Sequence, residues 1–205
     1  RTVLITGATR GIGKAIAIKL AKEGANIIIA AKSVTEDPRL GGTIYSAAAE
    51  VEAAGGKCLA VQVDIRFEDQ IEAAVAKAVE TFGGIDVVIN NASAIQLTGT
   101  EQTESKKFDL IHSINVRGTF LVVKHALPYL KKGDQPRIVT VTSSAQHMTP
   151  TINFRDPHLR KKYSAWRAYA QSKLANYYFA LGLHRKFKAE NSPIKSLLAH
   201  PGLSK

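Results

Sequence analysis

The chain alternates regularly between short apolar runs and longer amphipathic segments, and this alternation limits its possible folds more than any other feature. Strand-like apolar runs cover residues 1–6, 25–32, 57–65, 85–92, 137–144 and 194–202. Helical spacing of apolar residues covers 14–24, 44–56, 70–84, 105–132 and 168–188. The runs lack the every-second-residue pattern of half-exposed strands, so helices should cover both sheet faces. We therefore predict one domain, 1–205, with a doubly wound parallel α/β sheet in three layers, the Rossmann fold.

The composition predicts a single hydrophobic core. The chain has 205 residues, of which 45% are apolar, enough for one sizeable core. The single cysteine, Cys58, cannot form an intrachain disulfide and is expected to pack as a small apolar side chain. No apolar run approaches the ~20 residues that a membrane-spanning helix needs. Because the chain opens directly on a strand, an intracellular, by default cytoplasmic, location is expected, and organellar targeting stays open.

The net charge of +11 arises in the last third of the chain. Residues 1–130 contain 14 basic and 14 acidic side chains, whereas residues 131–205 contain 14 basic and 3 acidic ones. This asymmetry predicts either a peripheral contact with an anionic surface or simply a solvated face. No nucleic-acid-reading motif accompanies it, so no specific nucleic-acid binding is expected. The histidines lack ligand spacing, so no metal site is expected.

A glycine-rich turn, TGATRGIG at residues 6–13, joins the first strand to the first helix. Glycines allow a pyrophosphate to approach the backbone, and the amino terminus of a helix offers free N–H donors. A purely structural turn is the alternative. The first helix is expected to bury Ile16 and Leu20 and to end at a left-handed Gly24. The turn residues expected to bind a coenzyme are Gly7, Thr9, Arg10, Gly11, Ile12 and Gly13.

Polar residues follow the later strands in a recognisable order. NNAS, residues 90–93, ends the fourth strand, and Asn115 lies in the helix after it. Ser143 ends the fifth strand, with Ser144 as the alternative at this position. Tyr169 and Lys173 are four residues apart and so lie on one face of the next helix.

Taken in this order, TGATRGIG, NNAS, Asn115, Ser143 and YAQSK resemble the short-chain dehydrogenase/reductase family over essentially the whole chain. The resemblance implies an NAD(P)-dependent oxidoreductase that interconverts alcohols and carbonyls with an Asn–Ser–Tyr–Lys tetrad. It places that tetrad at Asn115, Ser143, Tyr169 and Lys173. It also implies a homodimer or homotetramer, and a further substrate-covering helix and seventh strand that residues 1–205 do not include.

The Tyr169–Lys173 pair suits proton transfer. A phenol is a poor acid–base group at neutral pH, but an ammonium ~4 Å away stabilises its ionised form by at most roughly 4 kcal/mol. In the implied reduction Tyr169 gives a proton to the carbonyl oxygen, which Ser143 holds. Lys173 also binds the nicotinamide ribose, and Asn115 completes a proton path through a water. The alternative is an ordinary helix with a buried Tyr169 and an exposed Lys173.

The end of the second strand indicates the coenzyme. An acidic residue there would bind the ribose hydroxyls of NAD and repel the extra phosphate of NADP. This chain instead has Ala31, Lys32 and Ser33, with Arg10 in the glycine turn, so NADP(H) is favoured over NAD(H). The resemblance adds an adenine contact at Asp64 and Ile65, a cleft wall at Asn91 and Ala92, and a nicotinamide contact at Pro201 and Gly202; Asn90 is expected to brace the sheet.

Two departures from the family pattern concern the substrate. Ser93 replaces the usual glycine, and an insertion of about residues 146–167 carries Phe154, Tyr163 and Trp166 between Ser143 and Tyr169. These aromatics either line a substrate pocket or form the insertion's own small core. Residues 32–56 and 82–95 resemble the hydroxysteroid dehydrogenase-like protein group, whereas 143–147, 168–176 and 199–202 resemble the retinol dehydrogenase branch.

Both resemblances imply a hydrophobic carbonyl or alcohol substrate of the retinoid, steroid or fatty aldehyde type. A non-catalytic NADP-binding sensor or scaffold protein with the same fold is the alternative function. Such a protein would be expected to have lost the tyrosine or the lysine, and this chain has both.

Overall fold

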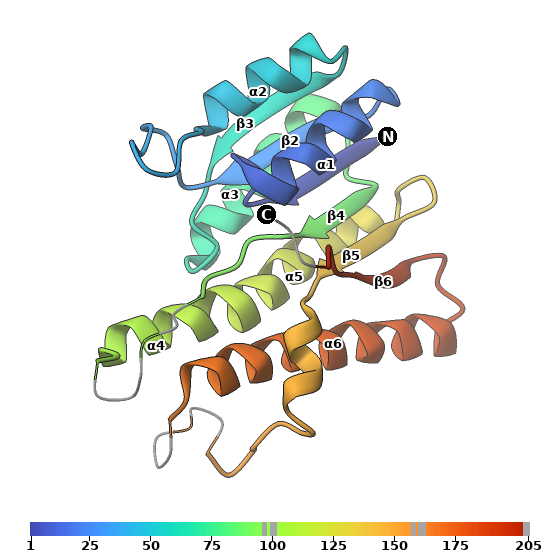
Figure 1. The fold of residues 1–205 in the computed structure, drawn as a ribbon. Coiled ribbons are helices and arrows are strands. Elements are labelled where there is room, and N and C mark those ends of the chain that lie inside the picture. The colour runs from blue at the N-terminus through green and yellow to red at the C-terminus, as the bar shows by residue number, and fades with distance from the viewer. Residues whose placement is uncertain (96–97, 99–101, 157–158, 160–162, 203–205) are drawn as a thin grey trace.

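A computed structural model describes residues 1–95, 98, 102–156, 159 and 163–202. Its centre is one sheet of six strands in the order β3-β2-β1-β4-β5-β6, and every neighbouring pair is parallel (Figure 1). The strands are β1 (Thr2–Thr6), β2 (Asn26–Ala31), β3 (Lys57–Gln62), β4 (Val87–Asn90), β5 (Arg137–Val141) and β6 (Lys195–Ala199). The predicted doubly wound α/β sheet is confirmed.

Helices cover the two faces of the sheet (Figure 1). The α-helices are α1 (Gly11–Lys22), α2 (Ile44–Ala53), α3 (Glu68–Phe82), α4 (Ser105–His112), α5 (Thr119–Leu130) and α6 (Ala165–Ala189). One apolar cluster joins α3, α5 and α6 to one face, and a second joins α1 and α2 to the other. The predicted three layers are therefore present.

The first helix buries a different stripe from the one expected. Its buried residues are Gly13, Ala17 and Ala21, whereas Ile16 and Leu20 pack against the same core cluster but are only half-buried. Small side chains allow the helix axis to approach the sheet closely, which a count of large apolar residues does not reveal. Gly24 follows the helix with φ of +81°, as expected of a left-handed cap.

The segment predicted as one helix over 105–132 is interrupted. A π-helical turn, η1 (Ser113–Gly118), separates α4 from α5. Gly118 lies in this turn against β3's continuation, where a Cβ would approach Cδ1 of Ile65 to 2.8 Å. The extra residue of a π turn changes which side chains face the sheet, and such turns are frequent at functional sites.

The strand order reverses between β1 and β4, because the chain fills β2 and β3 on one side and β5 and β6 on the other. In an open α/β sheet, ligands bind outside the carboxyl ends of the strands at this position. The glycine turn, Lys32, Asp64 and Asn91 each follow one of these strand ends. The topology thus brings the residues predicted to bind a coenzyme to one edge.

Candidate coenzyme and active site

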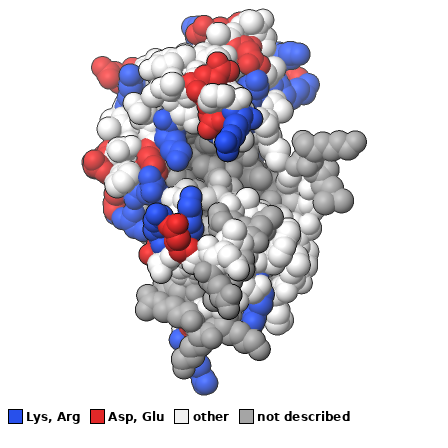
Figure 2. All heavy atoms as spheres, turned by 60° about the vertical axis from the view of Figure 1, so that its left-hand side comes forward, with Lys and Arg blue, Asp and Glu red and all other residues white. Residues whose placement is uncertain are grey.

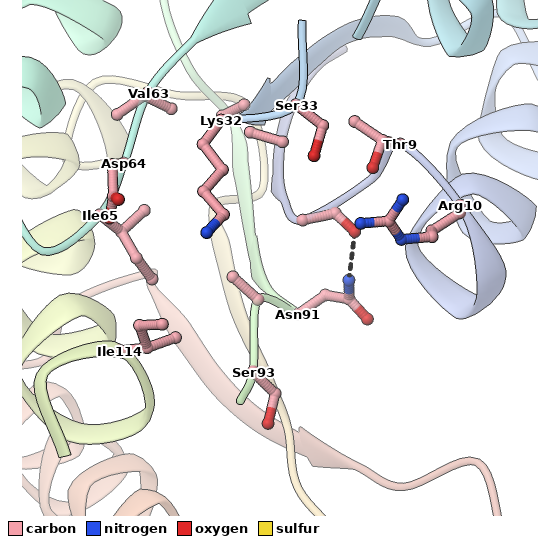
Figure 3. A pocket seen from close by; sticks show the side chains of 14 residues that line it. Thr9, Arg10, Lys32, Ser33, Val63, Asp64, Ile65, Asn91, Ser93 and Ile114 are labelled. Carbon is pink, nitrogen blue, oxygen red and sulfur yellow. Dashed lines mark hydrogen bonds between the residues drawn. The ribbon is translucent and has the colours of Figure 1, made fainter. Parts of the chain in front are cut away.

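A cavity of about 280 Å³ opens at the carboxyl ends of β1 to β4 (Figure 3). It gathers eight of the residues predicted to bind a coenzyme, namely Gly7, Thr9, Arg10, Lys32, Asp64, Ile65, Asn91 and Ala92. Ala30, Ala31, Ser33, Val63, Ser93 and Ile114 complete the lining.

The glycine turn packs too closely for side chains at two of its glycines. Gly7 has φ of +66°, and a Cβ there would approach Cα of Ala92 to 2.9 Å. A Cβ on Gly13 would approach Nδ2 of Asn91 to 2.5 Å. That nitrogen donates hydrogen bonds to the carbonyl oxygens of Thr6 and Gly7, each at 3.0 Å. Figure 3 draws one of these two hydrogen bonds. Gly7 and Gly13 are therefore required by packing against the end of β4, whereas a Cβ on Gly11 would meet nothing within 4 Å.

The amino terminus of α1 adds donors to this turn. Gly11 and Ile12 begin the helix, with φ of +53° at Gly11, and no side chain caps the terminus at Arg10. Uncapped N–H groups at a helix amino terminus attract anions. Together with the close-packed glycines, this arrangement fits a dinucleotide pyrophosphate.

Thr6, which sequence reasoning missed, holds the cavity floor in place. Its buried Oγ1 accepts hydrogen bonds from the backbone N–H groups of Asn91 and Ala92, both at 3.1 Å. Thr6 is a polar residue at the carboxyl end of β1, and that position was the available signal. The bonds fix the strand end of β4 against that of β1.

Two cations border the cavity. Lys32 extends into it in Figure 3, and within the part of the chain that the structure describes its ammonium has no ion-pair partner within 4.0 Å. Arg10 donates from Nη1 to the carbonyl oxygen of Gly41, which fixes its position. A Cβ on Gly42 would overlap the carbonyl oxygen of Thr9, so the 41–42 loop packs directly on the glycine turn.

Asp64 contributes a fixed negative charge at the opposite wall. Its Oδ2 lies 2.6 Å from Nη2 of Arg66. Burial alone would raise the pKa of the Asp64 carboxyl, but the hydrogen bonds from Arg66 outweigh it and hold that pKa below its usual value. Arg66 was not predicted as a site residue. Ile65 beside Asp64 is buried in the core.

Lys173 is buried next to Tyr169. Only 3% of Lys173 is exposed, which excludes the alternative of a solvated lysine. Its Nζ donates to the carbonyl oxygen of Val141 at 3.3 Å and lies 5.8 Å from the centre of the Tyr169 ring. Burial lowers the pKa of Lys173 to about 8. Tyr169 is half-buried, and neither it nor Lys173 is among the residues that line the cavity described above.

Asn115 is fully buried in the π turn and uses its whole side chain. Nδ2 donates to the carbonyl oxygen of Ala94 at 2.9 Å and to Oγ of Ser172 at 3.1 Å, and Oδ1 accepts from the N–H of Ala94 at 2.8 Å. Its carbonyl oxygen accepts from Oγ1 of Thr119 at 3.0 Å. Asn115 thus ties the segment after β4 to the residue adjacent to Lys173; Ser172 was not predicted.

Ser143 stands at the start of a short 3-10 helix, η2 (Ser144–Met148), two residues after β5. Its Oγ is half-buried and accepts from the N–H of Ala145 at 3.2 Å. Thr142 is buried, and its hydroxyl bonds to Oε1 of Gln146 at 2.9 Å. Ser144 is exposed. The choice of Ser143 over Ser144 stays a prediction.

Pro201 and Gly202 lie after β6 and are exposed. They are not in the lining of the cavity, so their predicted contact with the nicotinamide stays a prediction. Among the described residues no group of three or more His, Cys, Asp or Glu side chains could hold a metal ion. None of the described helices is both long and apolar enough to cross a membrane.

Comparisons with known proteins show which family the chain belongs to. A family model described as short chain dehydrogenase matches residues 1–205. Hydroxysteroid dehydrogenase-like protein 2 of Xenopus tropicalis is 50% identical over 189 residues, which are 92% of this chain and 43% of that protein. The match extends into both halves of the chain. The likeness of the second half to the retinol dehydrogenase branch stays a prediction.

Two solved structures share the fold. A short-chain dehydrogenase from Mycobacterium thermoresistibile is 40% identical, with a TM-score of 0.83, over 98% of this chain and 66% of that one. An NADH-dependent reductase, A1-R′, solved with NAD is 25% identical, with a TM-score of 0.76, over 98% of this chain and 78% of that one. The chain spans less than half the length of the curated relatives it matches. It belongs to the short-chain dehydrogenase/reductase family.

Proposed function

We propose that this protein is an NADP(H)-dependent oxidoreductase that interconverts a hydrophobic carbonyl compound and its alcohol. The observation that carries the proposal is the buried Lys173 beside the ring of Tyr169, at the sheet edge that also holds the glycine-lined cavity. An isolated buried cation is costly, and such groups concentrate at functional sites.

A bound nicotinamide coenzyme would donate or accept the hydride. In the direction of reduction, the hydroxyl of Tyr169 donates its proton to the carbonyl oxygen of the substrate. Ser143 donates a hydrogen bond to the same oxygen and so fixes the carbonyl next to Tyr169. The ammonium of Lys173 stabilises the phenolate that the proton leaves behind.

Lys173 and Asn115 have supporting roles in this proposal. The ammonium of Lys173 binds the ribose next to the nicotinamide and so orients the coenzyme. Asn115 holds α6 in register through Ser172, and a water at its backbone carbonyl completes a proton path from Lys173 to solvent. At pH 7, one unit below the Lys173 pKa of about 8, roughly nine tenths of the lysine is charged.

The preference for NADP(H) over NAD(H) follows from charge at the end of β2. Lys32 reaches the cavity and Arg10 is fixed beside it, and no acidic residue follows β2 directly. A 2′-phosphate carries nearly two negative charges and would be attracted to this pair. The rest of the dinucleotide would be held by the glycine turn and the end of β4, namely by Gly7, Thr9, Gly11, Ile12, Gly13, Asn91 and Ala92.

Separate titrations with NADP⁺ and NAD⁺ test this preference. The wild-type protein is expected to bind NADP⁺ at least about tenfold more tightly, equal to roughly 1.4 kcal/mol. Lys32→Asp should reverse the order, because a carboxylate there repels the phosphate and accepts from the ribose hydroxyls. An unchanged preference in Lys32→Asp would count against this role of Lys32.

Steady-state oxidation of NADPH tests the reaction itself, with retinal, decanal, a steroid ketone and a quinone as substrates. Tyr169→Phe is expected to reduce kcat by about 10²- to 10⁴-fold, the usual contribution of a general acid. Tyr178→Phe is the matched control, because this exposed tyrosine lies in the same helix. Equal rates in wild type and Tyr169→Phe would refute the mechanism, and NADPH binding without turnover of any carbonyl would favour the sensor or scaffold function.

A further inference from the structure

The three aromatic residues of the insertion have different surroundings. Phe154 is 81% exposed. Tyr163 packs edge-on against Phe108 of α4, with ring centres 5.6 Å apart, and so joins the insertion to that helix. Trp166 lies beside Tyr169, with ring centres 6.4 Å apart and planes at 77°. Trp166 is thus in contact with a residue of the proposed tetrad.

Trp166 is well placed to border the substrate. It lies in the first turn of α6, three residues before Tyr169, and so projects from the same face of the helix one turn earlier. Lys173 follows one turn later, with its ammonium 5.8 Å from the Tyr169 ring centre. The proposed proton donor therefore lies between an indole and an ammonium along the helix.

The indole is also open to a ligand. Trp166 is 48% exposed, although burial of an indole normally contributes strongly to stability. The edge-on contact with Tyr169 thus covers only part of the residue. A residue that served only to pack against Tyr169 would gain more by being covered.

We propose that Trp166 is a specificity-determining residue whose indole forms a wall of the substrate site and favours flat, conjugated or fused-ring carbonyl compounds over saturated chains. The proposal rests on the proposed role of Tyr169 as proton donor. Offset or edge-on aromatic contacts favour a ring over an aliphatic group of equal area by roughly two- to twelvefold in affinity. A saturated chain gains only the hydrophobic free energy of the surface that it buries.

The kinetic test compares 2-naphthaldehyde with undecanal, which has the same number of carbon atoms, in the presence of NADPH. Trp166→Leu is expected to raise KM for 2-naphthaldehyde by roughly two- to twelvefold and to change KM for undecanal by less than about twofold. The pH profile of kcat should stay the same. Trp166→Phe should restore most of the lost affinity, and Phe154→Leu, in the exposed part of the insertion, should leave both KM values unchanged.

Equal changes of KM for the two aldehydes, or no change for 2-naphthaldehyde, would overturn the proposal while leaving the proposed function intact. A direct binding test does not need turnover. Trp166 is the only tryptophan of the chain, so its fluorescence in the protein saturated with NADP⁺ should be quenched saturably by 2-naphthaldehyde and not by undecanal. N-acetyltryptophanamide corrects for light absorption by the aldehyde. Absence of saturable quenching would overturn the proposal; quenching without NADPH turnover would support it and refute only the proposed function.

Discussion

The single residue that most needs a functional explanation is Lys173. Its ammonium is buried, and among the described residues it has one long hydrogen bond, to the carbonyl oxygen of Val141 at 3.3 Å. Burying a charge with so little compensation destabilises the folded state. This destabilising lysine lies one helical turn from Tyr169. Its position therefore indicates a role for Lys173 in chemistry rather than in packing.

Replacing the lysine should therefore stabilise the protein. Burial lowers the pKa of Lys173 from 10.5 to about 8, a difference that corresponds to roughly 3 kcal/mol. Below pH 8 the folded state carries the full penalty, because the unfolded chain binds the proton more tightly. As pH rises from about 8 to 10.5 the penalty is relieved. Lys173→Met should thus be more stable than wild type at pH 7, by up to roughly 3 kcal/mol.

Urea unfolding of both proteins at pH 7 and pH 10 measures this effect. The advantage of Lys173→Met should shrink at pH 10, while titration of other groups affects both proteins alike. An equal pH dependence of the free energy of unfolding in the two proteins would show that Lys173 does not carry the penalty.

A substitution at Gly13 tests the predicted coenzyme-binding turn, again at the level of a single residue. In Gly13→Ala the new methyl would approach Nδ2 of Asn91 to 2.5 Å and the carbonyl oxygen of Gly7 to 2.7 Å. Overpacking of this kind costs about 1–3 kcal/mol, and NADP⁺ affinity should fall because the turn must shift. Calorimetric titration and urea unfolding measure the two effects.

The matched control is Gly182→Ala in α6, where a Cβ meets nothing within 4 Å. It should stabilise the protein by about 0.5–1 kcal/mol, because glycine is a poor helix residue, and leave NADP⁺ affinity unchanged. Similar losses in both variants would mean that the close contacts at Gly13 are not the cause.

Among the elements, the π turn η1 decides how the site is assembled. It places Asn115 so that one side chain bonds both backbone groups of Ala94 and the hydroxyl of Ser172. The segment after β4 and the helix that carries Tyr169 and Lys173 are thus joined through one amide. Loss of this amide should loosen the site and destabilise the fold together.

Asn115→Ala should therefore lower the free energy of unfolding by roughly 2–5 kcal/mol, because each buried backbone group left without a partner costs about 1–3 kcal/mol. Ser113→Ala, in the same turn, removes only the bond from Oγ to the carbonyl oxygen of Leu110 and should cost less than about 1.5 kcal/mol. Thermal and urea unfolding compare the two. A loss in Asn115→Ala no larger than that in Ser113→Ala would contradict the joining role of Asn115.

The order and type of the elements could be predicted because apolar periodicity reports which face each segment buries. The interruption at residues 113–118 could not be predicted from periodicity, and the side-chain contact made there, from Asn115 to Ala94, spans 21 residues of the chain. Periodicity also missed the most buried positions of α1, which are Gly13, Ala17 and Ala21; Ile16 and Leu20 pack against the core but are only half-buried. Small residues carry little weight in such patterns.

In the candidate site, too, some residues could be predicted from the sequence and others could not. Residues that follow strand ends, such as Arg10, Lys32 and Asp64, were predictable because parallel strands end at one edge. Thr6 was missed because the backbone groups that it binds are 85 and 86 residues away. Ser172 was missed because its partner Asn115 is 57 residues away. Contacts of this range follow from the assembled fold and not from local sequence.

At the scale of the whole molecule, described residues of both charge signs share the face that holds the site. On the face that includes the carboxyl ends of the strands, Lys and Arg are interspersed with Asp and Glu (Figure 2). Attraction of a dinucleotide should therefore be local, through Lys32 and Arg10, even though the chain carries +11 overall.

The affinity for NADP⁺ should accordingly fall severalfold when ionic strength rises from low to high salt, because the Debye length shortens from about 30 Å at 0.01 M to 3 Å at 1 M. Lys32→Ala should make this dependence shallower. Lys195→Ala, which removes an exposed cation of β6, should leave it unchanged. Equal slopes in all three proteins would indicate that the overall field, and not the two cavity cations, governs binding.

The most direct measurement is a crystal structure of the protein with NADP⁺ bound. The account predicts that the hydroxyls of Tyr169 and Ser143 both face the reactive carbon of the nicotinamide, with Nζ of Lys173 within about 3.2 Å of a hydroxyl of the adjoining ribose. A Tyr169 hydroxyl turned away from the ring, or a Lys173 ammonium in bulk water, would contradict it.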